Sequence, residues 1–258
     1  MCGIIGIASN KTVTSNIIQS LKKLEYRGYD SAGIATIVNG NIDEKKCTGR
    51  VDHLEKMLFK SPSKGSLGIG HVRWATHGMP NQVNAHPHSS EEVSVVHNGI
   101  IENSNELKKD LEKKGYKFKS QTDTEVITIL LTDFLKDFDL VDAINKTLKT
   151  LNGSFALGIL FKKFNNIVVG ARRGSPLAVG YGPEENYLGS DSYALKSMTN
   201  KITYLDDGDV CVLTNDRVDF YNSKNKKINK EILILSNDKH AAEKGEYKDF
   251  MSKEINEQ

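Results

Sequence analysis

Residues 1–9, MCGIIGIAS, place a cysteine second in the chain, with an apolar run directly behind it. A short apolar run that ends at polar residues is typical of a buried strand. Cys2 then has two interpretations. It is a small hydrophobic residue that suits the start of a core strand, or it is a reactive end, because removal of Met1 gives it a free α-amine beside its thiol. The stretch alone does not choose between them.

The composition is that of an ordinary globular protein. The chain has 258 residues, of which 38% are hydrophobic and 26% charged, enough for one large domain or two small ones. A net charge of +2 gives no strong field, so we expect neither a nucleic acid nor a membrane as partner. The longest apolar run, at 126–135, is too short to span a bilayer. The N-terminus lacks the basic region of a signal peptide.

The cysteines and histidines exclude two classes of site. Cys2, Cys47 and Cys211 are odd in number and widely spread, which argues against a disulfide framework and favours the cytoplasm. His86 and His88 flank a proline, but no ligand spacing typical of a metal site occurs. We therefore expect neither a metal nor another cofactor.

Strand patterns dominate both ends of the chain, and helices lie in the middle. A first helix is expected between the first two strands, with Ile17, Ile18, Leu21 and Leu24 on one face, a cap at Thr14 or Ser15 and an end at Gly28. This order favours an α+β fold in which two mostly antiparallel sheets are covered by helices. Strands are expected at 2–9, 31–38, 65–78, 92–100, 153–161, 166–173, 177–181 and 209–216, with a hairpin turn at 38–41 and helices at about 104–114, 123–136 and 139–151.

A nucleophilic cysteine needs a base and hydrogen-bond donors for the developing oxyanion. The base is one of the seven histidines or the α-amine of Cys2, whose ordinary pKa of about 7.7–8.0 suits proton transfer near neutral pH. Asn98-Gly99, in VVHNGIIEN, is either a tight turn or a pair of oxyanion donors. Residues 25–35, EYRGYDSAGIA, place Arg27 and Asp30 around a glycine, a pattern that favours a solvated helix end over a site.

Two further stretches suit a free amino acid. Arg73, in GHVRWATHG, offers a planar fork for a carboxylate, although a surface ion pair is the more ordinary role. Trp74, the only tryptophan, stands beside it, and Thr76 and His77 suggest a loop that closes over something small. Asp123, in SQTDTEV, is either a helix cap or a partner for an ammonium group. Arg73 and Asp123 together would hold both charges of an amino acid.

These stretches, in this order, resemble class II glutamine amidotransferase domains of the N-terminal nucleophile hydrolase superfamily. Within it they are most similar to the glutaminase domains of glucosamine-6-phosphate synthases. YRGYDSAG separates the chain from the amidophosphoribosyltransferases, which resemble HRGQESAG there. Val72 departs from the usual threonine. The resemblance rests on MCGIIGI, LEYRGYDSAGIA, HVRWATHG, NAHPH, VVHNGIIEN, TDTEVI, GSFALGIL and KGEYKDFMSKEI, which span essentially the whole chain.

The resemblance implies a four-layer αββα sandwich and a role for each candidate residue. It implies Cys2 as nucleophile with its own amine as base, Asn98 and Gly99 as oxyanion donors, Arg73 for the α-carboxylate, Asp123 for the α-ammonium, Thr76 and His77 in the closing loop, Trp74 as a gate for ammonia, and Arg27 as a support of the N-terminus.

The implied reaction is hydrolysis of the L-glutamine side-chain amide through a γ-glutamyl thioester. In a full-length homodimeric enzyme the ammonia would serve glucosamine 6-phosphate synthesis from fructose 6-phosphate. Residues 2–238 would be the glutaminase domain, a monomer by itself, and 239–258 the start of a linker to isomerase domains. Three alternatives stay open: an amidase for another amide, the glutaminase domain of another amidotransferase, and an inactive interaction domain in which Cys2 is a core residue.

Overall fold

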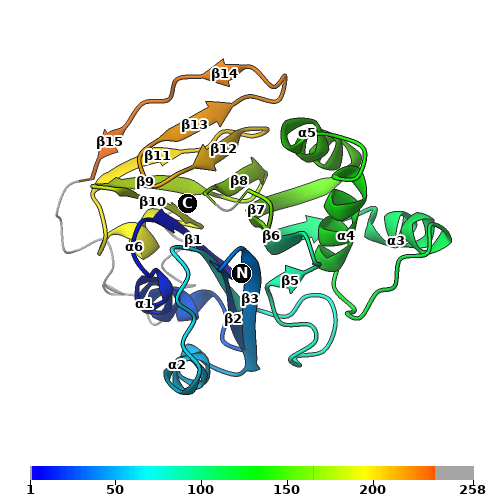
Figure 1. The fold of residues 1–258 in the computed structure, drawn as a ribbon, viewed down its shortest axis with the longest axis horizontal. Helices are drawn as coiled ribbons and strands as arrows, with labels where there is room; N and C mark the ends of the chain where they lie inside the picture. Colours follow the sequence, from blue (N-terminus) through cyan, green and yellow to red (C-terminus); the bar gives the residue numbers. More distant parts are fainter. Residues whose placement is uncertain (1, 165, 236–258) are drawn as a thin grey trace, which may run out of the picture.

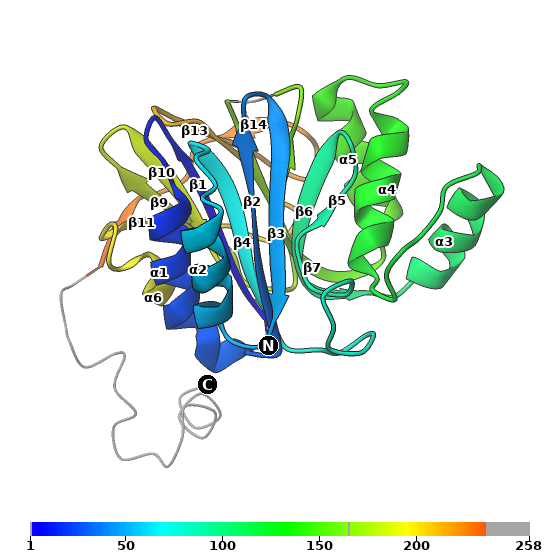
Figure 2. The ribbon, with the colours of Figure 1, turned by 60° about the horizontal axis from the view of Figure 1, so that its bottom comes forward.

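The computed structural model describes residues 2–164 and 166–235, and in them two antiparallel sheets lie face to face between layers of helices (Figures 1 and 2). The eight-stranded sheet has the order β15-β11-β9-β10-β1-β4-β2-β3, and the seven-stranded sheet the order β14-β13-β12-β8-β7-β6-β5. The strands are β1 (Gly3–Ser9), β2 (Ser31–Val38), β3 (Asn41–Thr48), β4 (Leu67–Arg73), β5 (His88–Ser89), β6 (Val93–Ile101), β7 (Gly153–Phe161), β8 (Val168–Arg173), β9 (Ala178–Gly182), β10 (Glu185–Gly189), β11 (Lys201–Tyr204), β12 (Val210–Leu213), β13 (Val218–Tyr221), β14 (Lys227–Ile228) and β15 (Leu233–Ile234).

The helices form the two outer layers. One group packs on the outer face of the eight-stranded sheet, and the other, led by α4 and α5, covers the outer face of the seven-stranded sheet (Figure 2). The predicted four-layer αββα sandwich is therefore confirmed. The helices are α1 (Thr14–Leu24), the short 3-10 helix η1 (Glu25–Arg27), α2 (Val51–Lys60), α3 (Ser104–Lys113), α4 (Thr124–Phe134), α5 (Leu140–Thr150) and α6 (Ser192–Leu195).

Strand β1 shows why the sequence folds this way. All of its residues are buried, because both faces of its sheet are covered. Since side chains alternate along a strand, Ile5 and Ile7 pack among the helices on one side, whereas Ile4 and Ala8 enter the layer between the two sheets. β1 lies between β10 and β4, so its first residue, next to Cys2, stands at the end of an interior strand rather than on an edge strand.

Several local expectations need correction. Thr14 does not cap α1, because its hydroxyl donates to the Ser63 carbonyl at 2.6 Å. Asn98-Gly99 is not a turn but lies inside β6, paired with Ala156 and Phe155 of β7. The structure adds helices α2 and α6, which were not expected. It also adds strands β5, β10, β11, β13, β14 and β15, which have only two to five residues each. The expected linker at 239–258 lies outside the described residues. Among the described helices, none has the length and apolar content to cross a bilayer.

Candidate functional site

The thiol of Cys2 is held by the turn that follows β4. Its Sγ lies 3.6 Å from the Trp74 carbonyl oxygen, and the Trp74 amide lies 3.4 Å from the same sulfur. Burial raises the pKa of the Cys2 thiol, and the hydrogen bond from the Trp74 backbone opposes that rise. A thiol with a raised pKa is a poor nucleophile at neutral pH unless a base takes its proton.

Asn98 approaches Cys2 from the opposite sheet. Its side-chain amide donates to the Cys2 carbonyl oxygen at 3.1 Å, and the residue is only 8% exposed. Gly99 follows with φ of +139°, in a conformation that other residues rarely adopt. A Cβ there would lie 2.1 Å from the backbone oxygen of Ser154, so β7 packs directly against this position. The amide that the sequence singles out therefore lies beside the cysteine.

Arg73 ends β4 and is 3% exposed, so it does not form the surface ion pair considered from the sequence. Its guanidinium donates to three carbonyl oxygens of the following loop: His77, Gly78 at 3.2 Å and Met79 at 3.5 Å. The side chains of Thr76 and His77 themselves are exposed. These contacts use Nη1 once and Nη2 twice, that is, three of the five N–H groups of the guanidinium, and they hold the loop against the end of β4.

Asp123 stands at the position before α4 but makes no capping hydrogen bond. Its Oδ2 accepts instead from the Ile101 amide at 2.8 Å, two residues beyond Gly99. Its Oδ1 lies 4.0 Å from His97 Nδ1, and the carboxylate is nearly buried. The structure thus fixes Asp123 against β6, the strand that carries Asn98.

Arg27 and Trp74 lie around the same end of the sheet. The Arg27 guanidinium pairs with Asp191 at 2.8 Å, and the next residue back, Ser190, accepts from the Ile4 amide at 2.5 Å. Arg27 is therefore linked to β1 through residues 190–191 rather than through a direct contact with Cys2. Trp74 is 43% exposed, and its ring packs edge to face on that of Tyr29, with the ring centroids 6.2 Å apart.

Two residues that the sequence pattern assigned to a solvated helix end support the site. Asp30 accepts from the Ala75 amide, and its own amide donates to the Arg73 carbonyl at 3.1 Å. A Cβ on Gly28 would lie 2.5 Å from the backbone carbon of Arg73 and 2.6 Å from the Trp74 nitrogen. Together they set the path of residues 73–75, which hold the thiol. The only signal in the sequence for this role is the glycine between Arg27 and Asp30.

Four buried imidazoles, those of His71, His86, His88 and His97, form a cluster next to Asp123. The ring centroids of His71 and His86 are 4.3 Å apart in a stacked pair, and those of His86 and His88 are 4.8 Å apart in an edge-to-face pair. His71 Nε2 lies 3.0 Å from the His97 carbonyl oxygen. Burial lowers the pKa of His71 to about 3, and it also lowers the pKa values of His86, His88 and His97. Within residues 2–164 and 166–235, no group of His, Cys, Asp or Glu side chains is arranged to hold a metal ion.

The cluster predicts acid sensitivity. An unfolded histidine titrates near pH 6.5, whereas the folded cluster stays neutral down to about pH 3 at His71. Above pH 6.5 both states are neutral. Below it the unfolded state binds more protons, so the free energy of unfolding falls by about 1.4 kcal/mol per pH unit for each such histidine. Urea unfolding at pH 7.5, 6.0 and 5.0 measures this slope.

A variant within the cluster checks the origin of that slope. His88→Gln removes one buried imidazole, so it is expected to reduce the slope by about the contribution of one histidine. A free energy of unfolding that stays constant between pH 7.5 and 5.0 would contradict the burial of neutral imidazoles.

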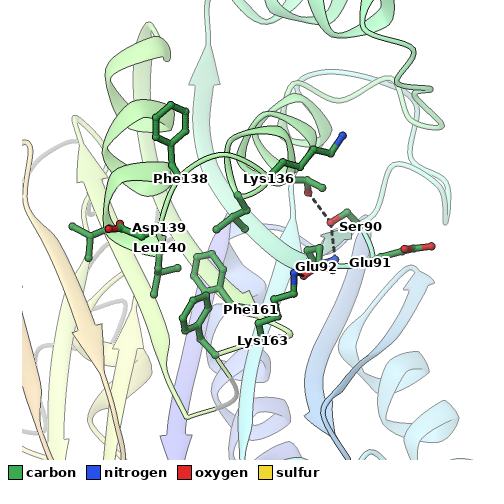
Figure 3. A pocket seen from close by; sticks show the side chains of 13 residues that line it. Ser90, Glu91, Glu92, Lys136, Phe138, Asp139, Leu140, Phe161 and Lys163 are labelled. Atoms are coloured by element: carbon green, nitrogen blue, oxygen red, sulfur yellow. Dashed lines mark hydrogen bonds and ion pairs between the residues drawn. The ribbon is translucent and has the colours of Figure 1, made fainter.

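A separate apolar cavity of about 800 Å³ lies between the α4–α5 connection and the β7–β8 turn (Figure 3). Phe138, Phe161 and Leu140 line it, and Lys163 stands at its edge, paired with Glu92 at 3.4 Å. It lies at the C-terminal end of α4, roughly 16 Å along the helix from Asp123 at the other end. The cavity is therefore not part of the site around Cys2.

Comparison with known proteins agrees with this geometry. Residues 71–197 match the model of the glutamine amidotransferase domain. The whole chain is 48% identical to glutamine–fructose-6-phosphate aminotransferase (isomerizing) of Mesorhizobium japonicum and 47% identical to that of Zymomonas mobilis. It spans 43% of the length of each.

A solved structure shows the same fold. Glutamine phosphoribosylpyrophosphate amidotransferase from B. subtilis matches 86% of this chain and 49% of its own, with a TM-score of 0.76 and 25% identity. This identity of 25% is lower than the 48% shared with the aminotransferase of Mesorhizobium japonicum. The difference agrees with the YRGYDSAG motif, which separates the chain from the amidophosphoribosyltransferases. The chain therefore belongs to the glutamine amidotransferase domains of the N-terminal nucleophile hydrolase superfamily and is homologous to the matched part of the glutamine–fructose-6-phosphate aminotransferases.

Proposed function

We propose that this chain hydrolyses the side-chain amide of L-glutamine, with Cys2 as the nucleophile. The observation that carries the proposal is the meeting of Cys2 with two groups that its chemistry needs. The Trp74 amide contacts its sulfur, and the Asn98 amide lies 3.1 Å from its carbonyl oxygen. The kinship with glutamine amidotransferase domains supports glutamine as the amide.

The reaction divides into two acyl transfers. The Cys2 sulfur attacks the amide carbon, its proton passes to the α-amine of Cys2, and that amine donates to the departing ammonia. The thioester that remains is hydrolysed by water, which releases glutamate. Because burial raises the pKa of the thiol, the nearby amine is essential. The amine is free only after Met1 is removed, and Met1 lies outside the described residues.

The oxyanion that forms in each step needs fixed donors. The Asn98 side-chain amide carries two protons, of which one is directed at Cys2 and the other is available for the oxyanion. The Gly99 backbone amide is the second proposed donor. Arg73 and Asp123 would bind the α-carboxylate and the α-ammonium. Thr76 and His77 would lie in the loop that closes over glutamine, and Trp74 would gate the transfer of ammonia. Arg27 would support the N-terminus through Asp191.

The longer relatives suggest the use of the ammonia. Because the chain spans 43% of proteins named for fructose 6-phosphate amination, we infer that residues 2–238 form the glutaminase domain and 239–258 begin a linker to isomerase domains. These would form a homodimeric enzyme that makes glucosamine 6-phosphate. The described cysteines are free thiols, in keeping with a cytoplasmic protein.

The direct test is ammonia and glutamate release from L-glutamine by the 258-residue chain, without any sugar phosphate. We expect glutamine to be the best substrate in a panel with L-asparagine and glutaramate, because these lack the chain length and the α-ammonium that the site would use. A panel in which another amide is hydrolysed faster would favour a different amidase. No product from any amide would favour an interaction domain.

A further inference from the structure

Thr124, the first residue of α4, lies between two buried imidazoles. Its hydroxyl oxygen is 2.7 Å from His86 Nε2 and 3.0 Å from His97 Nδ1, and the residue is 1% exposed. A hydroxyl has one proton to donate and two lone pairs that accept, so it can bond both rings while donating to at most one of them. Both rings are thereby fixed by a single side chain.

The two rings are held from other directions as well. His86 stacks on His71, whose Nε2 lies 3.0 Å from the His97 carbonyl oxygen. A carbonyl only accepts, so His71 Nε2 carries the proton and ties β4 to β6 beside Asn98. The elements that carry Arg73, Asn98 and Asp123 therefore meet at this cluster.

His97 Nδ1 has a second neighbour. Asp123 Oδ1 lies 4.0 Å from it, beyond hydrogen-bond distance, while the Thr124 hydroxyl is at 3.0 Å. Without that hydroxyl, a buried ring nitrogen would be left without its partner at an appreciable cost. The nearby carboxylate oxygen is then the natural replacement.

We propose that Thr124 is a positioning residue that keeps His97 away from Asp123, so that Asp123 Oδ1 stays available for the ammonium group of an amino-acid ligand. This inference rests on the proposed function, in which Asp123 binds the α-ammonium. Thr124 acts only through His97 and does not touch the substrate.

The test is Thr124→Val, which keeps the branched shape and removes the hydroxyl. With His97 turned to Asp123, we expect KM for L-glutamine to rise about tenfold, as the loss of one charge-assisted hydrogen bond implies, with a smaller change in kcat. Calorimetry should show a similar loss of affinity for L-glutamate but less than a twofold change for glutarate, which lacks the ammonium. Thr124→Ser, which restores the hydroxyl, should return both values to within about twofold to threefold of wild type.

The matched control is Thr147→Val on α5, where the buried hydroxyl donates only to the Ala143 carbonyl at 2.8 Å. It should lose stability without a change in either ligand's affinity. If Thr124→Val weakens L-glutamate and glutarate equally, or weakens neither, the positioning role is wrong. A wild-type chain that releases no ammonia contradicts the proposed function instead, and the binding of the two ligands still tests Thr124.

Discussion

Cys2→Ala is expected to remove glutamine hydrolysis, with a loss of roughly 10⁴-fold or more, as for other enzymes that lose a covalent nucleophile. Neither of the other thiols can substitute, since Cys47 and Cys211 are buried in the fold. Burial raises the pKa of Cys211 to about 12, which leaves it unreactive. Ammonia release measures the loss, and intact mass after treatment with a glutamine-like diazoketone shows a single adduct in the wild type.

The comparison that isolates the thiol is Cys2→Ser against Cys47→Ser. The first should lose the adduct, whereas the second, on the remote strand β3, should keep both the adduct and the activity. Full activity in Cys2→Ala would mean that Cys2 is only a core residue, as the plainer interpretation of the first strand allows. Loss of the adduct in both variants would indicate a damaged fold instead.

Asn98→Ala is expected to lower kcat by about 10²–10³-fold, the usual cost of one oxyanion donor. The same change removes the 3.1 Å contact that holds the Cys2 carbonyl oxygen, so the thiol also loses part of its alignment. Asn98→Asp, which keeps the shape but replaces two donors by a negative charge, should be at least as poor. Steady-state kinetics with L-glutamine measures both variants.

Asn186 offers a matched control for this change. It is likewise buried and donates to a backbone oxygen, that of Thr214, at 2.8 Å, but on β10 and away from Cys2. Asn186→Ala should cost stability and leave kcat nearly unaltered. Equal kcat losses in the two alanine variants would show that Asn98 matters through folding, and the oxyanion role would then be wrong.

Much of the fold could be predicted from the sequence, because long elements have clear periodicity. β1, β7 and α5 lie within one residue of their expected bounds. The elements that the sequence did not predict were missed for physical reasons. α2 is amphipathic, with Val51, Leu54 and Leu58 buried, but it is only ten residues long and half polar. β14 and β15 are two-residue edge strands, and the four-residue β13 lies next to β14, so their pairing depends on neighbours rather than on a local pattern. The placement of Asn98-Gly99 inside β6 was masked by strong local turn preference, which β7 overrides by packing its backbone against Gly99.

The candidate site was predictable as a set of residues but not as an arrangement. Cys2, Arg73, Asn98 and Asp123 stand out by residue type, and the structure places the amide of Asn98 beside Cys2. The support from Asp30 and Gly28 depends on contacts with residues 73–75, far along the chain, and no local pattern encodes those. The sequence gives no signal for Thr124, because its partners His86 and His97 come from two other segments.

The contact between Cys2 and Asn98 joins two different sheets. Cys2 leads into β1, Asn98 lies on β6, and what separates those strands is the layer that holds Ile4, Ile69 and Val96. The distance between Cys2 and the Asn98 amide therefore depends on the volume of the side chains in this layer. In the proposed reaction, a misplacement of about 1 Å is enough to cost much of the rate, so interior volume would act on turnover as well as on stability. A redesigned core of this domain would then have to be judged by turnover before its melting temperature.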